Sequence, residues 1–292
     1  MLRSLLFATS VVSLLGSLCA QDCLPEKSAT PSTPVPIRRV IFQNAPNLSR
    51  EARREIAKAL LDETVYAGSV SADMTRSADE ASERVRAAYQ NEGYFKAQVS
   101  TTAVPVAKEA AVRYDVVIRT LSEGMQYRLG DMQFTHMTAF PEQQLRDVFL
   151  IQRGEVFSRE KIAKGLEELR RLYGREGYIN FTAVPDTVLD ENNNSINLEI
   201  DVDEGKQFRL RSLEVFGVDS ETKARVLSEL AIKPGDIYNA ELWERSMEKF
   251  PNLIQDPDTA AKRLDERDGW VDAIIDFRKP DPCPIDRLAP EL

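Results

Sequence analysis

The chain has 292 residues, with 38 lysines and arginines against 47 aspartates and glutamates and a net charge of −9. That length allows two or three small cores, and 42% hydrophobic with 29% charged residues is the composition of a globular protein. The acidic balance disfavours nucleic acid and anionic lipid headgroups as the main partner.

The first 20 residues are typical of a secretory signal peptide. Arg3 precedes an apolar run that reaches Leu18 and ends at small residues. A membrane anchor is the alternative, but the run is short for a span and contains serines and a glycine. A lipidated Cys19 is a further alternative, although Leu18 is a poor residue before such a cysteine. We therefore expect a chain that leaves the cytoplasm, with no transmembrane segment in its mature form.

Residues 21–36 are rich in proline, serine and threonine and predict a linker. Cleavage of the signal would leave two cysteines, Cys23 near the start and Cys283 in the proline-rich tail, 281–292. In an oxidising compartment such a pair is a disulfide candidate. Two unpaired thiols in the tails fit the sequence equally well, so both readings stay open.

The first structured unit, 37–125, predicts a strand that starts at Ile37 and a helix over 50–61 behind the cap Ser49. A second helix is expected over 77–91 and ends at Gly93. Strands are expected over 94–104 and 112–121. The element order is therefore strand, helix, helix, strand, strand.

The second unit, 126–206, repeats that order more clearly. Pro141 is expected to open its first helix and Ser158 to cap its second. The second helix carries an apolar stripe typical of a helix that lies on a sheet: Ile162, Leu166, Leu169 and Tyr173. Glu176-Gly177-Tyr178 precedes the return strand 178–189, and an asparagine-rich turn leads to a last strand of alternating apolar residues.

The third unit, 207–280, keeps this skeleton at an offset of 81 residues, where Gly154-Glu-Val-Phe157 becomes Gly235-Asp-Ile-Tyr238. It lacks Glu-Gly-Tyr, and six residues are missing before its last strand. We expect its return strand at about 259–264. Such internal self-similarity is the signature of a tandem array.

A strand, two helices and a hairpin, with Gly154-Glu-Val-Phe157 between the helices and Glu176-Gly-Tyr178 before the return strand, resembles the POTRA domain of the Omp85 outer-membrane biogenesis family. The resemblance implies an α+β fold of tandem β-α-α-β-β repeats, each with a small three-stranded mixed sheet covered by two helices. The first unit departs from the pattern by a longer segment between its helices, 62–76.

In that family POTRA domains are periplasmic modules that precede a membrane barrel and bind partner proteins or unfolded clients. Only about a dozen residues follow Lys279, too few for a barrel. The resemblance therefore implies a non-catalytic periplasmic scaffold, or one peripheral at the outer membrane, that works in outer-membrane protein assembly or transport. Its partners would be envelope proteins, such as a barrel or unfolded outer-membrane clients. A structural module of another envelope complex, for division or secretion, is the alternative.

Strand addition is the physical route from such a fold to binding, because an edge strand leaves backbone groups that an extended segment can pair with. We expect the return strands to be those edges, with Pro105 and Pro185 in equivalent positions. The candidate binding residues are Tyr94, Phe95, Val99, Tyr178, Ile179, Phe181 and Val184.

Enzyme chemistry has little support in the sequence. The single histidine, His136, is expected to be solvated, and no nucleophile, phosphate-binding or zinc motif appears. The string Asp190-Glu-Asn-Asn-Asn194 resembles the start of a calcium loop but lacks its glycine and favours a turn. We therefore expect no catalytic residue, no metal and no cofactor.

Overall fold

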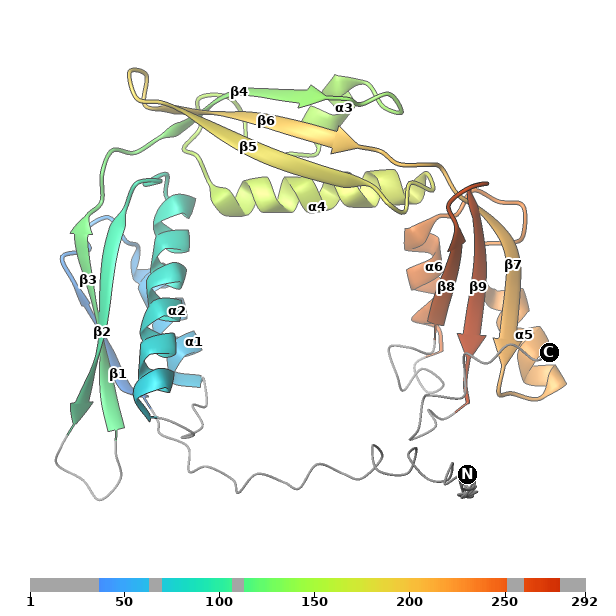
Figure 1. The fold of residues 1–292 in the computed structure, drawn as a ribbon, viewed down its shortest axis with the longest axis horizontal. Helices are drawn as coiled ribbons and strands as arrows, with labels where there is room; N and C mark the ends of the chain where they lie inside the picture. The colour runs from blue at the N-terminus through green and yellow to red at the C-terminus, as the bar shows by residue number, and fades with distance from the viewer. Residues whose placement is uncertain (1–36, 63–69, 107–112, 251–259, 279–292) are drawn as a thin grey trace, which may run out of the picture. The chain divides into compact units, whose positions relative to one another are not determined.

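The computed structural model describes residues 37–62, 70–106, 113–250 and 260–278. These residues form three β-sheets that follow one another along the chain (Figure 1). The predicted signal peptide, the linker, the tail, Cys23 and Cys283 lie outside the described residues.

The first sheet and its helices comprise β1 Ile37–Gln43, α1 Arg50–Asp62, α2 Val70–Asn91, β2 Gln98–Val106 and β3 Arg113–Ser122. The strand order is β1-β3-β2, with β1 parallel and β2 antiparallel to β3. Both helices lie on one face of the sheet (Figure 1). The predicted element order is confirmed for this unit, although α2 begins earlier than Ser77, where the sequence pattern starts.

The second unit comprises β4 Arg128–Thr135, α3 Glu142–Asp147, α4 Arg159–Arg175, β5 Thr182–Asp190 and β6 Ser195–Asp203, in the sheet order β4-β6-β5. The expected caps are in place. Pro141 precedes α3, and Ser158 Oγ accepts a hydrogen bond from Lys161 N at the start of α4. The hairpin turn after Asp190 forms because the Asp190 carboxylate accepts from the backbone of Asn192 and Asn193.

The third unit comprises β7 Arg209–Phe216, α5 Ser220–Glu229, α6 Ala240–Met247, β8 Ala260–Asp265 and β9 Trp270–Asp276, in the order β7-β9-β8. Its return strand β8 lies where the sequence predicted it, although this unit lacks the Glu-Gly-Tyr landmark. All three units are therefore mixed three-stranded sheets with helices, as the resemblance implied.

Each sheet has its own hydrophobic core. In the second unit the stripe of α4 packs on the alternating apolar residues of β6: Ile162, Leu169 and Tyr173 are buried against Ile196, Leu198 and Ile200. Leu166 is partly buried at the margin. One face of each sheet thus meets helices, and the three cores are successive rather than shared.

Two sequence predictions about the return strands are wrong. The strands begin at Gln98 and Thr182, four residues later than expected, because glycines with φ of +83° and +84° form a turn first. In that turn the backbone N–H of Tyr94 and of Tyr178 bonds back to the helix end. Nor are the two prolines equivalent: Pro105 is the eighth residue of β2, whereas Pro185 is the fourth of β5.

Candidate binding edges and unit junctions

Strands β2, β5 and β8 each lie at the edge of their sheet. Among the described residues, no strand pairs with the outer side of any of them. Each therefore presents unpaired backbone N–H and C=O groups to its surroundings, which is the chemical requirement for adding an extended segment.

Of the predicted binding residues, only Val99 and Val184 lie on these edge strands. Val99 packs against the first core, while the Val184 side chain is 63% exposed on the outer face of β5. Two further exposed apolar residues, Val104 on β2 and Val188 on β5, were not among the candidates. They occupy the same place in the two units when the strands are aligned from their first residues.

A groove runs between α4 and the start of β5. Its walls combine apolar side chains with one acid and one base at the rim, from Ala163, Leu166, Glu167, Arg170, Phe181, Thr182 and Ala183. Phe181 precedes β5 and is buried, with its ring stacked on Tyr173 at 4.1 Å between centroids. The groove could therefore accept apolar side chains of a segment that lies along the first residues of β5.

The other predicted residues lie in the turns before the strands, where two of them contact the next unit. Phe95 packs against the second core, with its ring edge-to-face with Phe157 at 5.8 Å between centroids. Ile179 packs in the same way against the third core. Tyr94 and Tyr178 stay with their own cores. Sequence reasoning placed all four on an edge strand, but Phe95 and Ile179 form junctions between units.

Backbone atoms complete both junctions. The carbonyl oxygen of Gly93 accepts from Tyr127 N at 2.8 Å, and that of Gly177 accepts from Phe208 N at 2.9 Å. A Cβ at Gly177 would lie 2.7 Å from the Phe208 carbonyl oxygen and 2.9 Å from an Ile237 methyl group. Only glycine fits this position, because the next unit approaches so closely.

A glutamate at the end of each of the first two units fixes the loop after the first strand. Glu204 Oε1 accepts hydrogen bonds from the backbone of Thr138 at 2.7 Å and of Ala139 at 2.8 Å, and from the Tyr173 hydroxyl at 2.9 Å. Glu123 accepts from Asn47 and Tyr89 in the same arrangement. Burial raises the pKa of Glu204, but the hydrogen bonds led by Thr138 outweigh it and the pKa is lowered overall.

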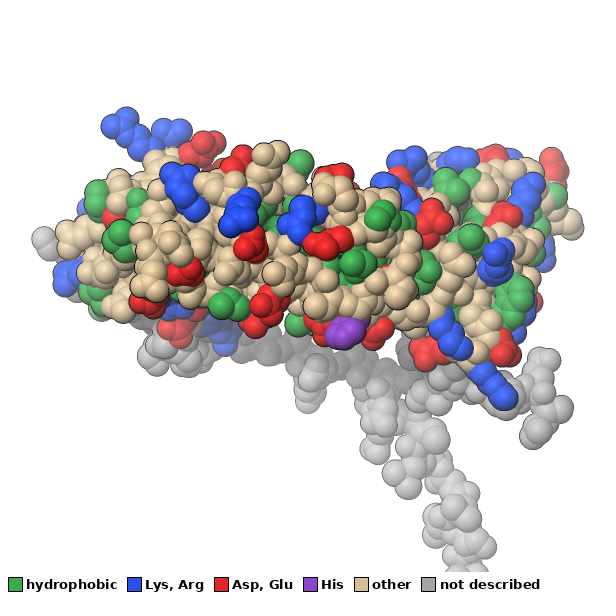
Figure 2. Space-filling model, turned by 90° about the horizontal axis from the view of Figure 1, so that it is seen from above, with side chains coloured by type: hydrophobic (Ala, Val, Ile, Leu, Met, Phe, Trp, Pro, Cys, Tyr) green, Lys and Arg blue, Asp and Glu red, His purple; other side chains and the backbone are tan. Residues whose placement is uncertain are grey.

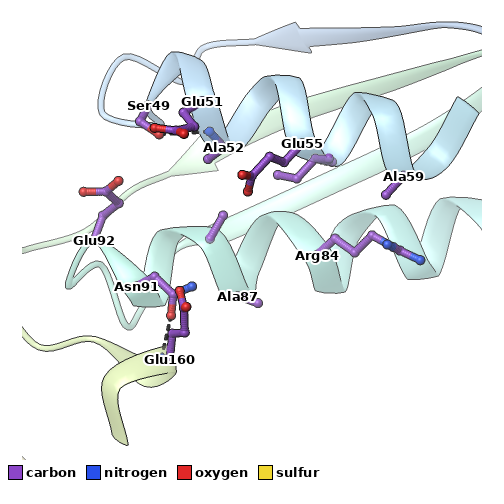
Figure 3. A pocket seen from close by; sticks show the side chains of 12 residues that line it. Ser49, Glu51, Ala52, Glu55, Ala59, Arg84, Ala87, Asn91, Glu92 and Glu160 are labelled. Carbon is purple, nitrogen blue, oxygen red and sulfur yellow. Dashed lines mark hydrogen bonds between the residues drawn. The ribbon is translucent and has the colours of Figure 1, made fainter. Parts of the chain in front are cut away.

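A second open hollow lies between α1 and α2 (Figure 3). Its floor is made of small side chains such as Ala52 and Ala87, and the carboxylates of Glu51, Glu55 and Glu92 stand around it. Glu160 reaches its rim from the second unit, where its backbone N–H donates to Asn91 Oδ1 at 2.8 Å. These carboxylates come from α1, from the residue after α2 and from α4, and they do not converge on a common point (Figure 3).

His136 lies on the surface with acidic side chains beside it (Figure 2). Its Nδ1 is 2.5 Å from Asp201 Oδ1, and this contact, together with Thr135, lowers the pKa of Asp201. Within the described residues, no group of three or more histidine, cysteine, aspartate or glutamate side chains is arranged to hold a metal ion. In the same part of the chain, no helix combines the length and the apolar character needed to cross a membrane.

Residues 127–205 match the family model described as "POTRA: Surface antigen variable number repeat". Over 171 residues the chain is 24% identical to a putative outer membrane protein assembly factor of Treponema pallidum. This match covers 58% of this chain and 20% of that protein. It is 26% identical over 164 residues to the outer membrane protein assembly factor BamA of Buchnera aphidicola, covering 56% of this chain and 26% of the relative. The matches thus span about a fifth to a quarter of these relatives.

The fold is similar to the crystal structure of Haemophilus influenzae BamA POTRA3-5. The TM-score is 0.63 at 18% sequence identity, and the match covers 87% of this chain and all of the solved one. At this identity the likeness shows the fold, which is a tandem array of three such units.

Proposed function

We propose that this chain, a POTRA-domain protein that resembles the periplasmic arm of the outer-membrane assembly factors, is a non-catalytic scaffold in outer-membrane protein assembly or transport. It binds extended segments of client or partner proteins by strand addition. The observation that carries this proposal is the open backbone edge of β2 and β5. The relatives named above as outer membrane protein assembly factors support the proposed role in outer-membrane protein assembly or transport.

A binding role fits the surface better than a catalytic one. The carboxylates near the α1–α2 hollow are dispersed, and His136 is exposed with a single acidic partner. General acid–base or nucleophilic catalysis needs groups that converge on one reacting atom. The edges, by contrast, offer main-chain pairing that tolerates many client sequences, together with exposed valines beside them.

Site-specific photo-crosslinking in the producing cells tests the proposal. A photoreactive phenylalanine analogue at Val104 or Val188, each 44% exposed on an edge strand, should trap outer-membrane proteins of several sizes. Leu150, which is 73% exposed and lies away from the edge strands, is the matched control and should trap few. Equal labelling from Leu150 would contradict edge binding.

The same experiment separates the alternative, a structural module of another envelope complex. That role requires one stable partner, so every edge position would give one adduct of a single mass. Such a result would favour a fixed interface over client handling.

A further inference from the structure

The α1–α2 hollow is an open groove of about 510 Å³ between two helices that run in opposite directions (Figure 3). Glu51, near the start of α1, lies at the same end of the hollow as Asn91, the last residue of α2. Four alanines line the groove, two from each helix: Ala52, Ala59, Ala87 and Ala88. Because an alanine side chain ends at Cβ, a further helix could pack against both helices with a short distance between the axes.

The alanines of the hollow are particular to the first unit. When the first two units are aligned at their junction glycines, Ala87 corresponds to Arg171 and Ala88 to Leu172. The first helix of each pair also differs in length, with 13 residues in α1 and six in α3. The corresponding part of α4 therefore carries long side chains where α2 carries alanines.

Three carboxylates stand along this groove without a partner. Glu51 and Glu55 lie one helical turn apart on α1, about 6 Å along its axis. Glu92 follows α2 and is half-buried. Among the described residues, none of these three side chains takes part in an ion pair or a hydrogen bond. The only base among the described residues that line the hollow, Arg84, already donates from Nε to Glu80 at 3.2 Å.

On α4, by contrast, acidic side chains are paired within the helix. Glu160 lies 2.5 Å from Lys164 Nζ, and Glu168 lies 2.7 Å from an Arg171 nitrogen. The basic residues of α1 do not line the hollow: Arg50, Arg53, Arg54 and Lys58. The hollow thus has a negative charge that its own helices do not neutralise, and this charge is complementary to a partner that carries cations.

We propose that the α1–α2 hollow binds a cationic helix of a partner protein. Small apolar side chains of that helix pack on the alanines, while lysines or arginines spaced i,i+4 meet Glu51 and Glu55, which have the same spacing. Ala52 and Ala59 are seven residues apart, or about 10 Å of helix, so the contact takes about two turns. Glu160 stands at the rim, so the bound helix also reaches the second unit.

This site goes beyond strand addition. The residues that line the hollow come from α1, α2, their flanks and α4, and the described part of the chain contributes none from the edge strands β2, β5 and β8. A helix in a groove binds through its side chains, whereas an added strand binds through main-chain hydrogen bonds. Failure of either binding mode would therefore leave the other intact.

A synthetic helix tests the proposal on the full chain. The probe is an alanine-rich peptide of about 16 residues with lysine at every fourth position, since isolated helices shorter than about 12 to 15 residues are marginal in water. In protein labelled at its alanine methyl groups, NMR spectra should show peptide-dependent shifts at Ala52, Ala59 and Ala87. An absence of binding, or shifts confined to alanines outside the hollow, would overturn the inference.

Charge reversal tests the carboxylates. Glu51→Lys combined with Glu55→Lys should weaken binding of the lysine peptide about tenfold or more, because two attractions become repulsions. The same variant should bind a peptide with glutamate in place of lysine more tightly than the parent does. Glu199→Lys combined with Glu214→Lys is the matched control, with the same change in net charge at exposed positions on β6 and β7. Equal losses of affinity in the two double variants would overturn the inference.

Two further measurements separate packing and helicity from charge. Ala87→Gln adds bulk without charge and should weaken binding about fivefold or more, whereas Ala163→Gln, at an exposed position on α4, should leave it within about twofold. A lysine peptide with a central proline cannot form a continuous helix and should bind at least about tenfold more weakly. Equal binding of that peptide would overturn the helical occupant. Thermal unfolding shows whether each variant is folded, and the methyl shifts of the unmodified protein stand in any case.

Discussion

Three of the five tyrosines that are buried among the described residues differ in what their hydroxyl groups contact. Tyr89 and Tyr173 each donate to the glutamate that fixes a loop in their own unit. Tyr238 is fully buried in the third core, and its hydroxyl has no hydrogen-bond partner among the described residues. Phe157 fills the equivalent position of the second unit, so the site itself does not require a hydroxyl.

Replacing Tyr238 by phenylalanine should therefore stabilise the protein. The variant loses a desolvated hydroxyl and keeps the aromatic ring, so we expect the free energy of unfolding to rise by about 1 kcal/mol. Tyr173→Phe is the control, since it removes one of the hydrogen bonds that Glu204 accepts and should lower that free energy by about 1 kcal/mol. Denaturant unfolding measures both, and a loss of stability in Tyr238→Phe would show that the hydroxyl is satisfied.

Glu204 should make stability depend on acid. Its folded pKa is lowered, so its contribution is fully present above the ordinary glutamate pKa of about 4.3 and is lost as pH falls through the folded value. The free energy of unfolding should thus fall less for Glu204→Gln than for the parent between about pH 6 and about pH 3. Glu199→Gln, at an exposed position on β6, is the control and should follow the parent.

At the scale of elements, much of the fold follows from the sequence. Ser158, Pro141 and the stripe of α4 signal their structures locally, and the three units support one another by repetition. The binding residues were harder to predict, because Phe95 and Ile179 have the spacing of a strand yet are held in a turn by contacts with the next unit. Such contacts join residues far apart in sequence and leave no local pattern.

The turn at Gly177 offers a matched pair of substitutions. Gly177 and Gly154 have nearly the same backbone, with φ of +84° and +86°, but a Cβ at Gly154 would meet nothing within 4 Å. Alanine at either position carries the strain of a positive φ, while only Gly177→Ala also collides with the next unit. We expect Gly177→Ala to cost at least about 1 kcal/mol more in unfolding free energy. Equal losses of unfolding free energy in the two variants would show that the junction rearranges to accommodate the added Cβ.

At the scale of the whole described molecule, three cores are linked through side chains that one unit inserts into the next. Phe95 and Ile179 are the links, each beside a glycine whose carbonyl oxygen is bonded across the junction. Stability in such an array is a sum of unit terms and nearest-neighbour terms. A substitution at a junction should therefore also change the stability of the adjacent unit.

Phe95→Ala tests this coupling. The residue belongs to the first unit, but its ring rests on the second core, so the variant should lower the stability of the second unit by about 1 to 2 kcal/mol, less than for a fully buried phenylalanine. Hydrogen exchange should accelerate more in β6 than in β3. Met125→Ala, at a position 61% exposed, should change neither strand. Faster exchange confined to β3 would contradict the coupling.

The junctions at Gly93 and Gly177 also bear on how such arrays grow by gene duplication. The hydrogen bonds that the two glycine carbonyl oxygens accept use only main-chain atoms. The facing side chains differ between the two copies: Val156 and Phe157 at one, Ile237 and Tyr238 at the other. A duplicated or exchanged module would thus find a compatible neighbour without simultaneous changes on both sides. The number of units can change in evolution while the sequence of each copy diverges toward a separate function.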